Sequence, residues 1–381
     1  MTYIFLAATL FCLYTYLGFP LVLHLRANRA RVVLGQANNP LPPSEDQLPS
    51  VSIIIAAHNE AGNLPGKIAS LEALDYPEHL LECIFVSDGS TDDTVDIFSD
   101  ACESHERWQL YHYGAAAGKP TALNIGVSRA RGDIVVFMDA RQSVAPAAIR
   151  ALVNRLQEQS IGVVSGELVL HDDLGREAAN VGLYWKYEKW IRDNESHLFS
   201  TTGATGALYA IRRADYQPLP ADALLDDFDT PISLLKLGKR TVLEPAAQIF
   251  DQAEADSSRE FKRKVRTLTG NFQSFSRHSW LFDPRINPIW WQFLSHKVFR
   301  LLVPYALMLA LFASVAGNTP FLSAMLLVQI CFYSLGLLGV LGLDTRLTSI
   351  IKIFLQLNVA AVIGAWRASQ GGGSAVRWKT S

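Results

Sequence analysis

Acidic residues follow the apolar runs of this chain at three points. Glu60, Asp88 and Asp139 each stand at or just after a short run that is rich in β-branched and aromatic residues. Such runs are typical of strands that are buried on both faces, as in the middle of a parallel sheet. Ligands of open α/β sheets bind outside the carboxyl ends of the strands. Helix capping explains a single such acid equally well, but the repeated pattern favours one shared binding crevice.

A fourth acidic group, Asp226-Asp227-Asp229, comes later in the chain, and Lys119 lies between the second and the third of these apolar runs. No Gly-x-Gly-x-x-Gly loop follows the first run and the P-loop pattern is missing, which argues against a dinucleotide cofactor and a glycine-rich phosphate loop. Separate acids with a lysine suit another task, in which one Asp holds a divalent metal on a diphosphate and another acid holds a nucleoside. Hard oxygen ligands favour Mg²⁺ or Mn²⁺.

Three apolar runs indicate buried strands: Val51–Ala57, Leu81–Val86 and Ile134–Met138. Trp108–Tyr113 is expected to be a further strand, and helical spacing fills the segments between these strands. Strands that alternate with helices predict an α/β fold with a doubly wound, mostly parallel sheet. Further strands are expected at Gly162–Leu170 and Ala207–Ile211, and a further helix at Pro231–Leu237.

Three aromatic residues, Trp185, Tyr187 and Trp190, lie at helical spacing within Glu177–His197. Packing is the favoured explanation for them. The alternative is a platform for sugar rings, which present apolar faces.

The first apolar segment, Tyr3–Leu25, contains no charged residue and is long enough to cross a bilayer. The basic residues Arg26, Arg29 and Arg31 follow it, which places that end in the cytoplasm. Because the basic residues come after the run and no small-x-small cleavage site is evident, a retained anchor is favoured over a signal peptide.

The C-terminal third is apolar again. Phe299–Ala316 and Phe321–Leu343 predict a transmembrane hairpin, and Ile350–Trp366 is a third candidate that contains three polar residues. One anchor and three later spans put the C-terminus outside, whereas the basic residues of the last segment favour the inside. The side of the C-terminus therefore stays open.

These patterns divide the chain into an N-terminal anchor (1–25), a linker (26–50), a cytoplasmic catalytic domain (51–257), an amphipathic interfacial segment (258–298), C-terminal transmembrane helices (299–366) and a tail (367–381). Ser257–Phe275 is basic on one side and apolar on the other, which suits the surface of the cytoplasmic leaflet.

The net charge of −2 argues against a general nucleic-acid binder. The four scattered cysteines suggest neither a disulfide framework nor a zinc site.

An ordered set of segments resembles the membrane-embedded inverting glycosyltransferases of family 2, the group that holds the cellulose, chitin and hyaluronan synthases. The matching segments are Val51–Glu60, Ser87–Asp93, Gly118–Gly126, Gly132–Arg141, Thr201–Arg213 and Asp226–Thr230. Each segment is a weak signal alone, but the order and the spacing are specific. The resemblance implies a Rossmann-like, nucleotide-sugar-binding domain flanked by transmembrane helices.

Carried over by position, the resemblance implies that Asp88 contacts the base or ribose of the nucleotide, with His58 and Glu60 beside it. Asp139 looks like the first acid of the family's Asp-x-Asp, which holds the metal and the diphosphate. Arg141 replaces the second acid of that motif. Arg141 either contacts phosphate or is surface charge, and both interpretations stay open.

The resemblance also places Asp227 where the family's Thr-Glu-Asp has its catalytic base, with Lys119 and Asp226 among the expected substrate-binding residues. Inverting transfer needs one base to take the proton of the acceptor hydroxyl. Neighbouring Asp226 and Asp229 should raise the proton affinity of Asp227. The alternative explanation is that these acids only stabilise the N-terminus of a helix.

Arg266 is kept from the family's Gln-x-x-Arg-Trp motif, while the Gln and the Trp are absent. It is expected to contact either the diphosphate or lipid headgroups. The loss of the Trp, which stacks under the acceptor sugar in the family, puts the synthesis of long chains in doubt.

Together these expectations describe an inverting, metal-dependent glycosyltransferase, multi-pass in the cell membrane, with its catalytic domain in the cytoplasm. The donor is expected to be a nucleotide-diphosphate sugar of the UDP type, and the acceptor a polysaccharide or a lipid-linked glycan. Membrane lipid and a possible partner subunit are further expected contacts, and the choice between a polymerising and a single-addition enzyme stays open. The alternative is a catalytically silent membrane scaffold subunit of a polysaccharide complex, which the residue at 141 supports.

Overall fold

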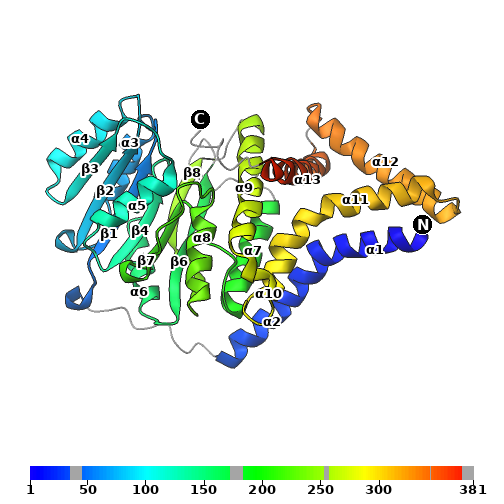
Figure 1. The fold of residues 1–381 in the computed structure, drawn as a ribbon, viewed down its shortest axis with the longest axis horizontal. Coiled ribbons are helices and arrows are strands. Elements are labelled where there is room, and N and C mark those ends of the chain that lie inside the picture. Colours follow the sequence, from blue (N-terminus) through cyan, green and yellow to red (C-terminus); the bar gives the residue numbers. More distant parts are fainter. Residues whose placement is uncertain (35–44, 172–182, 253–256, 344, 371–381) are drawn as a thin grey trace.

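The computed structural model describes residues 1–34, 45–171, 183–252, 257–343 and 345–370. A sheet with helices on both faces is joined to a group of long helices that extends away from it (Figure 1). The strand order across the sheet is β3-β2-β1-β4-β7-β6-β8-β5. The strands are β1 (Val51–Ala57), β2 (Leu81–Asp88), β3 (Trp108–Tyr113), β4 (Ile134–Asp139), β5 (Ser143–Val144), β6 (Ile161–His171), β7 (Leu208–Arg212) and β8 (Arg240–Gln252).

The first four strands run parallel, as the alternation of strands and helices predicts. Ala57 of β1 lies opposite Ser87 of β2, and Ala56 lies opposite Asp139 of β4. The carboxyl ends of β1, β2 and β4 are therefore level and form one edge. β7 is antiparallel to both of its neighbours, β4 and β6, and β5 is antiparallel to β8. The sheet is thus mixed but mostly parallel, which confirms the predicted fold class.

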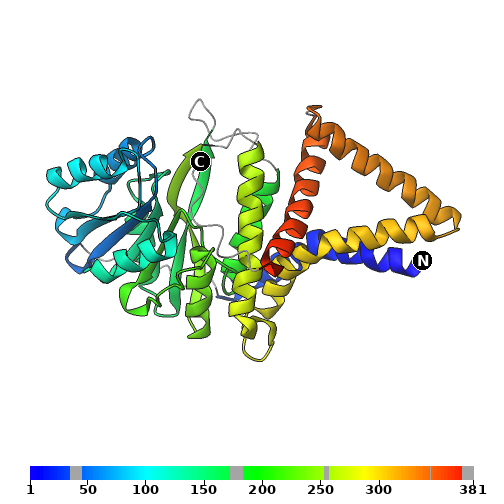
Figure 2. The ribbon, with the colours of Figure 1, turned by 45° about the horizontal axis from the view of Figure 1, so that its top comes forward.

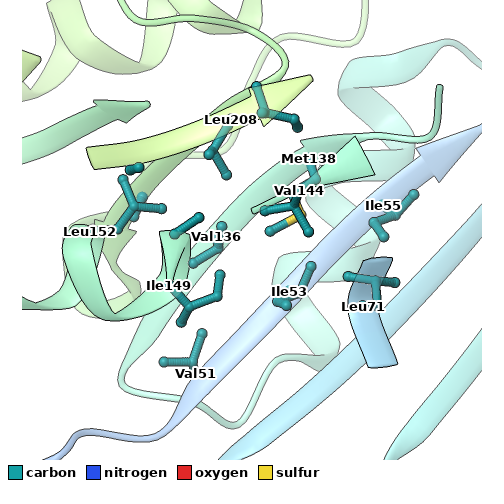
Figure 3. Close-up of a cluster of buried hydrophobic side chains, with 14 of the residues drawn as sticks. Val51, Ile53, Ile55, Leu71, Val136, Met138, Val144, Ile149, Leu152 and Leu208 are labelled. Carbon is teal, nitrogen blue, oxygen red and sulfur yellow. The ribbon is translucent and has the colours of Figure 1, made fainter. Parts of the chain in front are cut away.

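The central strands are apolar along their whole length because alternate residues enter apolar clusters on opposite faces of the sheet. Ile53 and Ile55 of β1 face one cluster, which includes Leu71 and Ile149 (Figure 3). The helices α3 (Leu64–Glu72), α4 (Thr94–Ser104) and α6 (Ala148–Leu156) cover this face. Ile54 points to the other face, which is covered by α5 (Lys119–Arg129) and α8 (Asp226–Lys236).

Within the described residues, four helical stretches are long and apolar enough to cross a membrane: Thr2–Arg31, Trp290–Ala316, Pro320–Val340 and Arg346–Ser369. The first comprises α1 (Thr2–Leu13), a π-helical turn (Tyr14–Gly18) and most of α2 (Phe19–Leu34). The second comprises α10 (Trp290–Gln292), another π-helical turn (Phe293–Val298) and α11 (Phe299–Ala316). α1 lies beside α11, and α12 (Pro320–Val340) and α13 (Arg346–Ser369) lead back to α9 (Ser257–Arg277) (Figures 1 and 2).

Several boundaries differ from the sequence-based expectations. The N-terminal helix continues to Leu34, so the first part of the expected 26–50 linker is helical, while 35–44 lie outside the described residues. The helix at the acidic group begins at Asp226 rather than Pro231, which places the acids in its first turn. Of the expected Glu177–His197 helix the structure describes α7 (Leu183–Leu198). Most of the 367–381 tail lies outside the described residues.

The apolar side of α9 also differs from the expectation of a lipid-facing surface. Val265 is buried, and Leu268 and Phe272 pack against a cluster that includes Phe228 of α8, Phe293 and Ala361 of α13. An amphipathic pattern reports only that one side of a helix avoids water, and it is the same whether lipid or protein covers that side. Here α8, α13 and the start of the second membrane stretch cover it.

Candidate active site

A cavity of about 460 Å³ opens at the carboxyl ends of β1 and β4. The lining comes from the turn after β1, the start of α5, the residues after β4, a glycine before β7, the segment that leads into α8, and one side of α9. Its members are Ala56, Glu60, Asn63, Ala117–Pro120, Asp139–Gln142, Gly206, Ala221–Asp227, Arg263, Arg266 and Thr267. Of the sequence-predicted site residues, Glu60, Lys119, Asp139, Asp226, Asp227 and Arg266 therefore share one cavity.

Lys119 links two of the acids in this cavity. Its Nζ lies 2.8 Å from Oδ1 of Asp139 and 3.2 Å from Oδ1 of Asp226. Burial alone would lower the pKa of Lys119, but the two carboxylates outweigh it and hold the pKa above its usual range. The ammonium therefore stays charged and joins the end of β4 to the start of α8.

Asp88 fixes the start of α5 from behind the cavity. Its carboxylate accepts hydrogen bonds from the backbone N–H groups of Ala117 (2.7 Å) and Gly118 (2.8 Å). Gly118 has a φ of +99°, a conformation that favours glycine, so the chain turns sharply into Lys119. The carbonyl oxygen of Asp88 in turn accepts from Nδ1 of His58, at 2.6 Å. The structure thus places the side chains of Asp88 and His58 beneath the loop rather than on the cavity wall.

Asp227 lies in the first turn of α8 and is backed by a glycine-rich loop. A Cβ at Gly206 would lie only 3.0 Å from Oδ2 of Asp227, so the lack of a side chain there allows the approach. The loop is also hydrogen-bonded to the backbone of Asp227, because the Ala204 N–H donates to the Asp227 carbonyl oxygen at 2.8 Å. Burial and then the charge of Asp226 raise the pKa of Asp227 to about 6, against the opposing effect of Lys119. A carboxylate with this pKa is a suitable general base near neutral pH.

Glu60 is a further acid on the cavity wall. Asn63 Nδ2 donates to its Oε2 at 2.6 Å, which holds the side chain over the turn after β1. Burial raises the pKa of Glu60, although the bond from Asn63 opposes this.

Arg141, which stands where the family has a second acid, forms an ion pair with Asp251 of β8. Gln142 Nε2 donates to the same carboxylate at 3.0 Å. Arg141 therefore lines the cavity while its charge is already balanced. Sequence reasoning missed Asp251, because no spacing rule connects residues 110 positions apart.

Arg263 and Arg266 reach the cavity mouth from α9 and are exposed. Arg263 was not singled out from the sequence, although its place one turn before Arg266 was a usable signal. Asp229, by contrast, turns away from this wall and lies 3.4 Å from both Arg277 and His278 at the end of α9.

The aromatic side chains of α7 contact the N-terminal helix. Tyr187 Oη donates to the carbonyl oxygen of Tyr16 at 2.8 Å, and the Trp190 ring lies 5.2 Å from that of His24. These contacts agree with the packing explanation for Tyr187 and Trp190.

Comparison with known proteins gives a family for this domain. The model of the family "Glycosyl transferase family 2" matches residues 52–217. Over 234 residues the chain is 26% identical to the probable glycosyltransferase YdaM of Bacillus subtilis, a match that covers 59% of this chain and 56% of that protein. It is 30% identical over 122 residues to a beta-monoglucosyldiacylglycerol synthase of Nostoc, covering 32% of this chain and 26% of that one.

A further curated relative is a poly-beta-1,6-N-acetyl-D-glucosamine synthase of Staphylococcus epidermidis, 28% identical over 121 residues, with 32% of this chain and 29% of that one covered. The matched part thus spans about half or less of these relatives' own length. Among solved structures, a mannosyltransferase from Pyrobaculum calidifontis in complex with GDP-Man and Mn²⁺ superposes with a TM-score of 0.73 at 24% identity, covering 95% of this chain and 98% of that one. That likeness shows that the two chains share a fold. Residues 52–217 of this chain therefore resemble glycosyl transferase family 2, and the chain shares its fold with that mannosyltransferase.

Proposed function

We propose that this chain is an inverting, metal-dependent glycosyltransferase that moves a sugar from a nucleotide-diphosphate donor to a glycan or lipid-linked acceptor at a membrane. The observation that carries the proposal is that Asp139, Lys119, Asp226 and Asp227 surround one cavity at the carboxyl edge of a parallel sheet. The cavity is large enough for part of a sugar nucleotide, and its charged groups are of the kinds that a diphosphate and a nucleophilic hydroxyl require.

Asp227 is the proposed catalytic base. Its carboxylate accepts the proton of the acceptor hydroxyl as that oxygen attacks the anomeric carbon, and the bond from that carbon to the diphosphate breaks. A single displacement of this kind inverts the anomeric centre. The neighbouring Asp226 forms an ion pair with Lys119 at 3.2 Å.

Lys119 is the proposed contact for the leaving diphosphate. Its ammonium lies on the cavity wall between the two acids and is held there by the turn that Asp88 fixes. A fixed cation at the leaving oxygen stabilises the charge that develops there. Arg266, at the cavity mouth, is the second proposed contact for the donor.

The residues present fit a divalent metal that is shared with the donor. No group of three or more metal-ligating side chains is found in the described part of the chain. Asp139, however, lines the cavity with its side chain 36% exposed and offers a hard carboxylate. One protein carboxylate with diphosphate and water suits Mg²⁺ or Mn²⁺. Such an ion, held by Asp139, supplies positive charge to the diphosphate.

The membrane setting is part of the proposal. The apolar helices at both ends of the chain and the basic residues after the first one support a multi-pass protein whose catalytic domain faces the cytoplasm. The Mn²⁺ and GDP-Man in the mannosyltransferase of the same fold support a metal and a nucleotide-sugar donor. The relatives named as synthases of a polysaccharide and of a glycolipid support the two proposed acceptor classes.

The test is Asp227→Asn. The purified chain is offered UDP- and GDP-linked sugars with Mn²⁺ or Mg²⁺ and membrane-lipid acceptors, and nucleoside diphosphate release is measured. The variant should lose about 10²- to 10⁴-fold in rate while it still binds UDP or GDP. Failure of the wild type to transfer from any donor would favour the silent scaffold. Product length separates a polymerase from a single-addition enzyme.

A further inference from the structure

A buried group of four charged residues joins α7 to the second membrane-length stretch. Nδ1 of His296, in the π-helical turn Phe293–Val298, lies 2.7 Å from Oε1 of Glu195. Its Nε2 lies 3.2 Å from Oε2 of Glu188. Both ring nitrogens of His296 therefore face carboxyl oxygens of α7. His296 is 3% exposed and Glu195 is fully buried.

Arg300, one turn further along the same stretch, completes the group. It forms an ion pair with Glu188, and its guanidinium lies 5.6 Å from the Tyr187 ring and 5.7 Å from the Tyr16 ring. Burial raises the pKa of Glu188, but Arg300 and His296 outweigh burial and hold that pKa well below its usual range. Ionisable groups buried against a membrane-length helix are costly and point to a function.

α7 carries this connection to the loop that backs the catalytic base. The backbone N–H and the hydroxyl of Thr202 both point to Oε2 of Glu195, at 3.4 and 3.5 Å, so His296 and the loop share one carboxylate. One turn earlier on α7, Arg192 donates to Oγ1 of Thr205 at 3.0 Å. α7 therefore contacts the Ser200–Gly206 loop at two points.

The same loop contacts Asp227 at two points. Ala204 N–H donates to the carbonyl oxygen of Asp227, at 2.8 Å, and Gly206 faces its carboxylate closely enough that a side chain there would meet it. A continuous path of contacts thus leads from His296 through Glu195 and Thr202 to the proposed base. Each link is a hydrogen bond or a close backbone contact rather than loose apolar packing.

We propose that His296 is a positioning residue for transfer: it holds Glu195, and through it the Ser200–Gly206 loop, so that Asp227 faces the cavity in its reactive orientation. The membrane-embedded part of the chain then sets the geometry of the base, and transfer depends on how this stretch docks on α7. This inference rests on the proposed role of Asp227. Displacing a reacting group by about 1 Å costs on the order of 10²-fold in rate, so a small shift of the loop is enough to be measured.

The experiment compares His296→Gln, Glu195→Gln and Thr202→Val in the full-length chain. The assay is nucleoside diphosphate release, with the donor that supports wild-type turnover. Each variant should lower kcat by about 10- to 100-fold, while KM for the donor and the binding of UDP or GDP with Mn²⁺ stay within about twofold. The double variant Glu195→Gln/His296→Gln should be no slower than His296→Gln alone, because residues of one path are not additive.

His24→Gln is the matched control. His24 also stands on a membrane-length helix and also contacts α7, through Asn194 at 3.0 Å, but that contact does not continue to the loop. This control should turn over like the wild type. Thr202→Val removes the contact of the Thr202 hydroxyl with Glu195 and leaves both the backbone contact and the membrane interface in place, so it tests the path if His296→Gln fails to fold.

Two results overturn the inference. Wild-type kcat in Thr202→Val and His296→Gln, beside an inactive Asp227→Asn, would show that the base needs no such support while the proposed function stands. A loss in KM rather than kcat would show that the path serves the donor instead. Absence of transfer by the wild type with every donor would reject the proposed function itself.

Discussion

Two adjacent carboxylates at the start of α8 differ in their surroundings, and this difference supports the different roles proposed for them. Asp226 has Lys119 at 3.2 Å and also accepts a hydrogen bond from Tyr209 Oη at 3.3 Å. Asp227 has neither partner and bears the repulsion of its neighbour, which together with burial raises its pKa to about 6. The run of acidic residues was enough to predict that the pKa of Asp227 is raised. It did not predict which acid is neutralised, because the contact with residue 119 exists only in the folded chain.

The raised pKa makes a prediction about pH. Asp227 acts as a base only when it is ionised, so activity should be lost as the pH falls through about 6, by about tenfold per further unit. A pH profile of kcat/KM measures this loss of activity.

Asp226→Asn removes the neighbouring charge and should move the inflexion of this pH profile to lower pH in the residual activity. Glu60→Gln should leave it in place; if the inflexion vanishes in Glu60→Gln, the titrating group is Glu60 and the assignment to Asp227 is wrong.

Lys119→Met removes the cation that Asp139 and Asp226 share. The two carboxylates are then left without a counter-charge and should repel the donor diphosphate. We expect KM for the donor to rise about 10- to 100-fold, as for the loss of a hydrogen bond to a charged group. Lys236→Met at the exposed end of α8 is the matched control and should behave like the wild type. An unchanged KM in Lys119→Met would exclude a diphosphate contact for this lysine.

At the scale of whole elements, the strands could be predicted best because apolar runs of strand length leave few alternatives. β1 agrees with its predicted bounds, whereas the direction of β7 was not predictable. A short apolar run reads the same in either direction, and only the path of the connections decides. α8 begins at Asp226, five residues before the predicted start at Pro231, and this proline lies inside the helix.

Close packing of α5 on β1 gives a test at this scale. A Cβ at Gly126 would lie 2.5 Å from Cγ2 of Ile54, so Gly126→Ala must push α5 off the sheet. Overpacking of this kind costs roughly 1–3 kcal/mol, and α5 carries Lys119 at its start. We therefore expect a lower apparent Tm together with a higher KM for the donor. Gly62→Ala, whose Cβ meets nothing within 4 Å, should change neither. Thermal unfolding of the detergent-solubilised protein and initial rates measure both effects.

For the whole molecule, the sequence predicted apolar helices at both ends but not that the last of them packs against a helix that lines the cavity. α13 contains Lys352, Gln356 and Asn358, which made it the weakest predicted span, yet it packs along α9. α9 carries Arg263 and Arg266 to the cavity mouth on one side and is covered by α13 on another. Periodicity identifies a buried side of a helix but not its partner, so this contact could not be read from the sequence.

The contact between α13 and α9 links the last membrane-length helix to a wall of the cavity, and Gly364 is one point where the two helices approach closely. A Cβ there would lie 3.1 Å from the backbone nitrogen of Thr269, one turn after Arg266. Gly364→Leu should therefore separate the two helices and shift Arg266. We expect KM for the donor to rise several-fold and stability to fall by roughly 1–3 kcal/mol.

The control for this variant is Val359→Leu, an enlargement of similar kind at a residue that is 51% exposed on the same helix. It should leave both quantities unchanged, because an exposed apolar side chain on a membrane-length helix has room to grow. Initial rates over a range of donor concentrations and thermal unfolding in detergent measure the two effects. If Gly364→Leu lowers stability but keeps the donor KM of the wild type, α13 supports the fold only, and Arg266 does not depend on it to reach the donor.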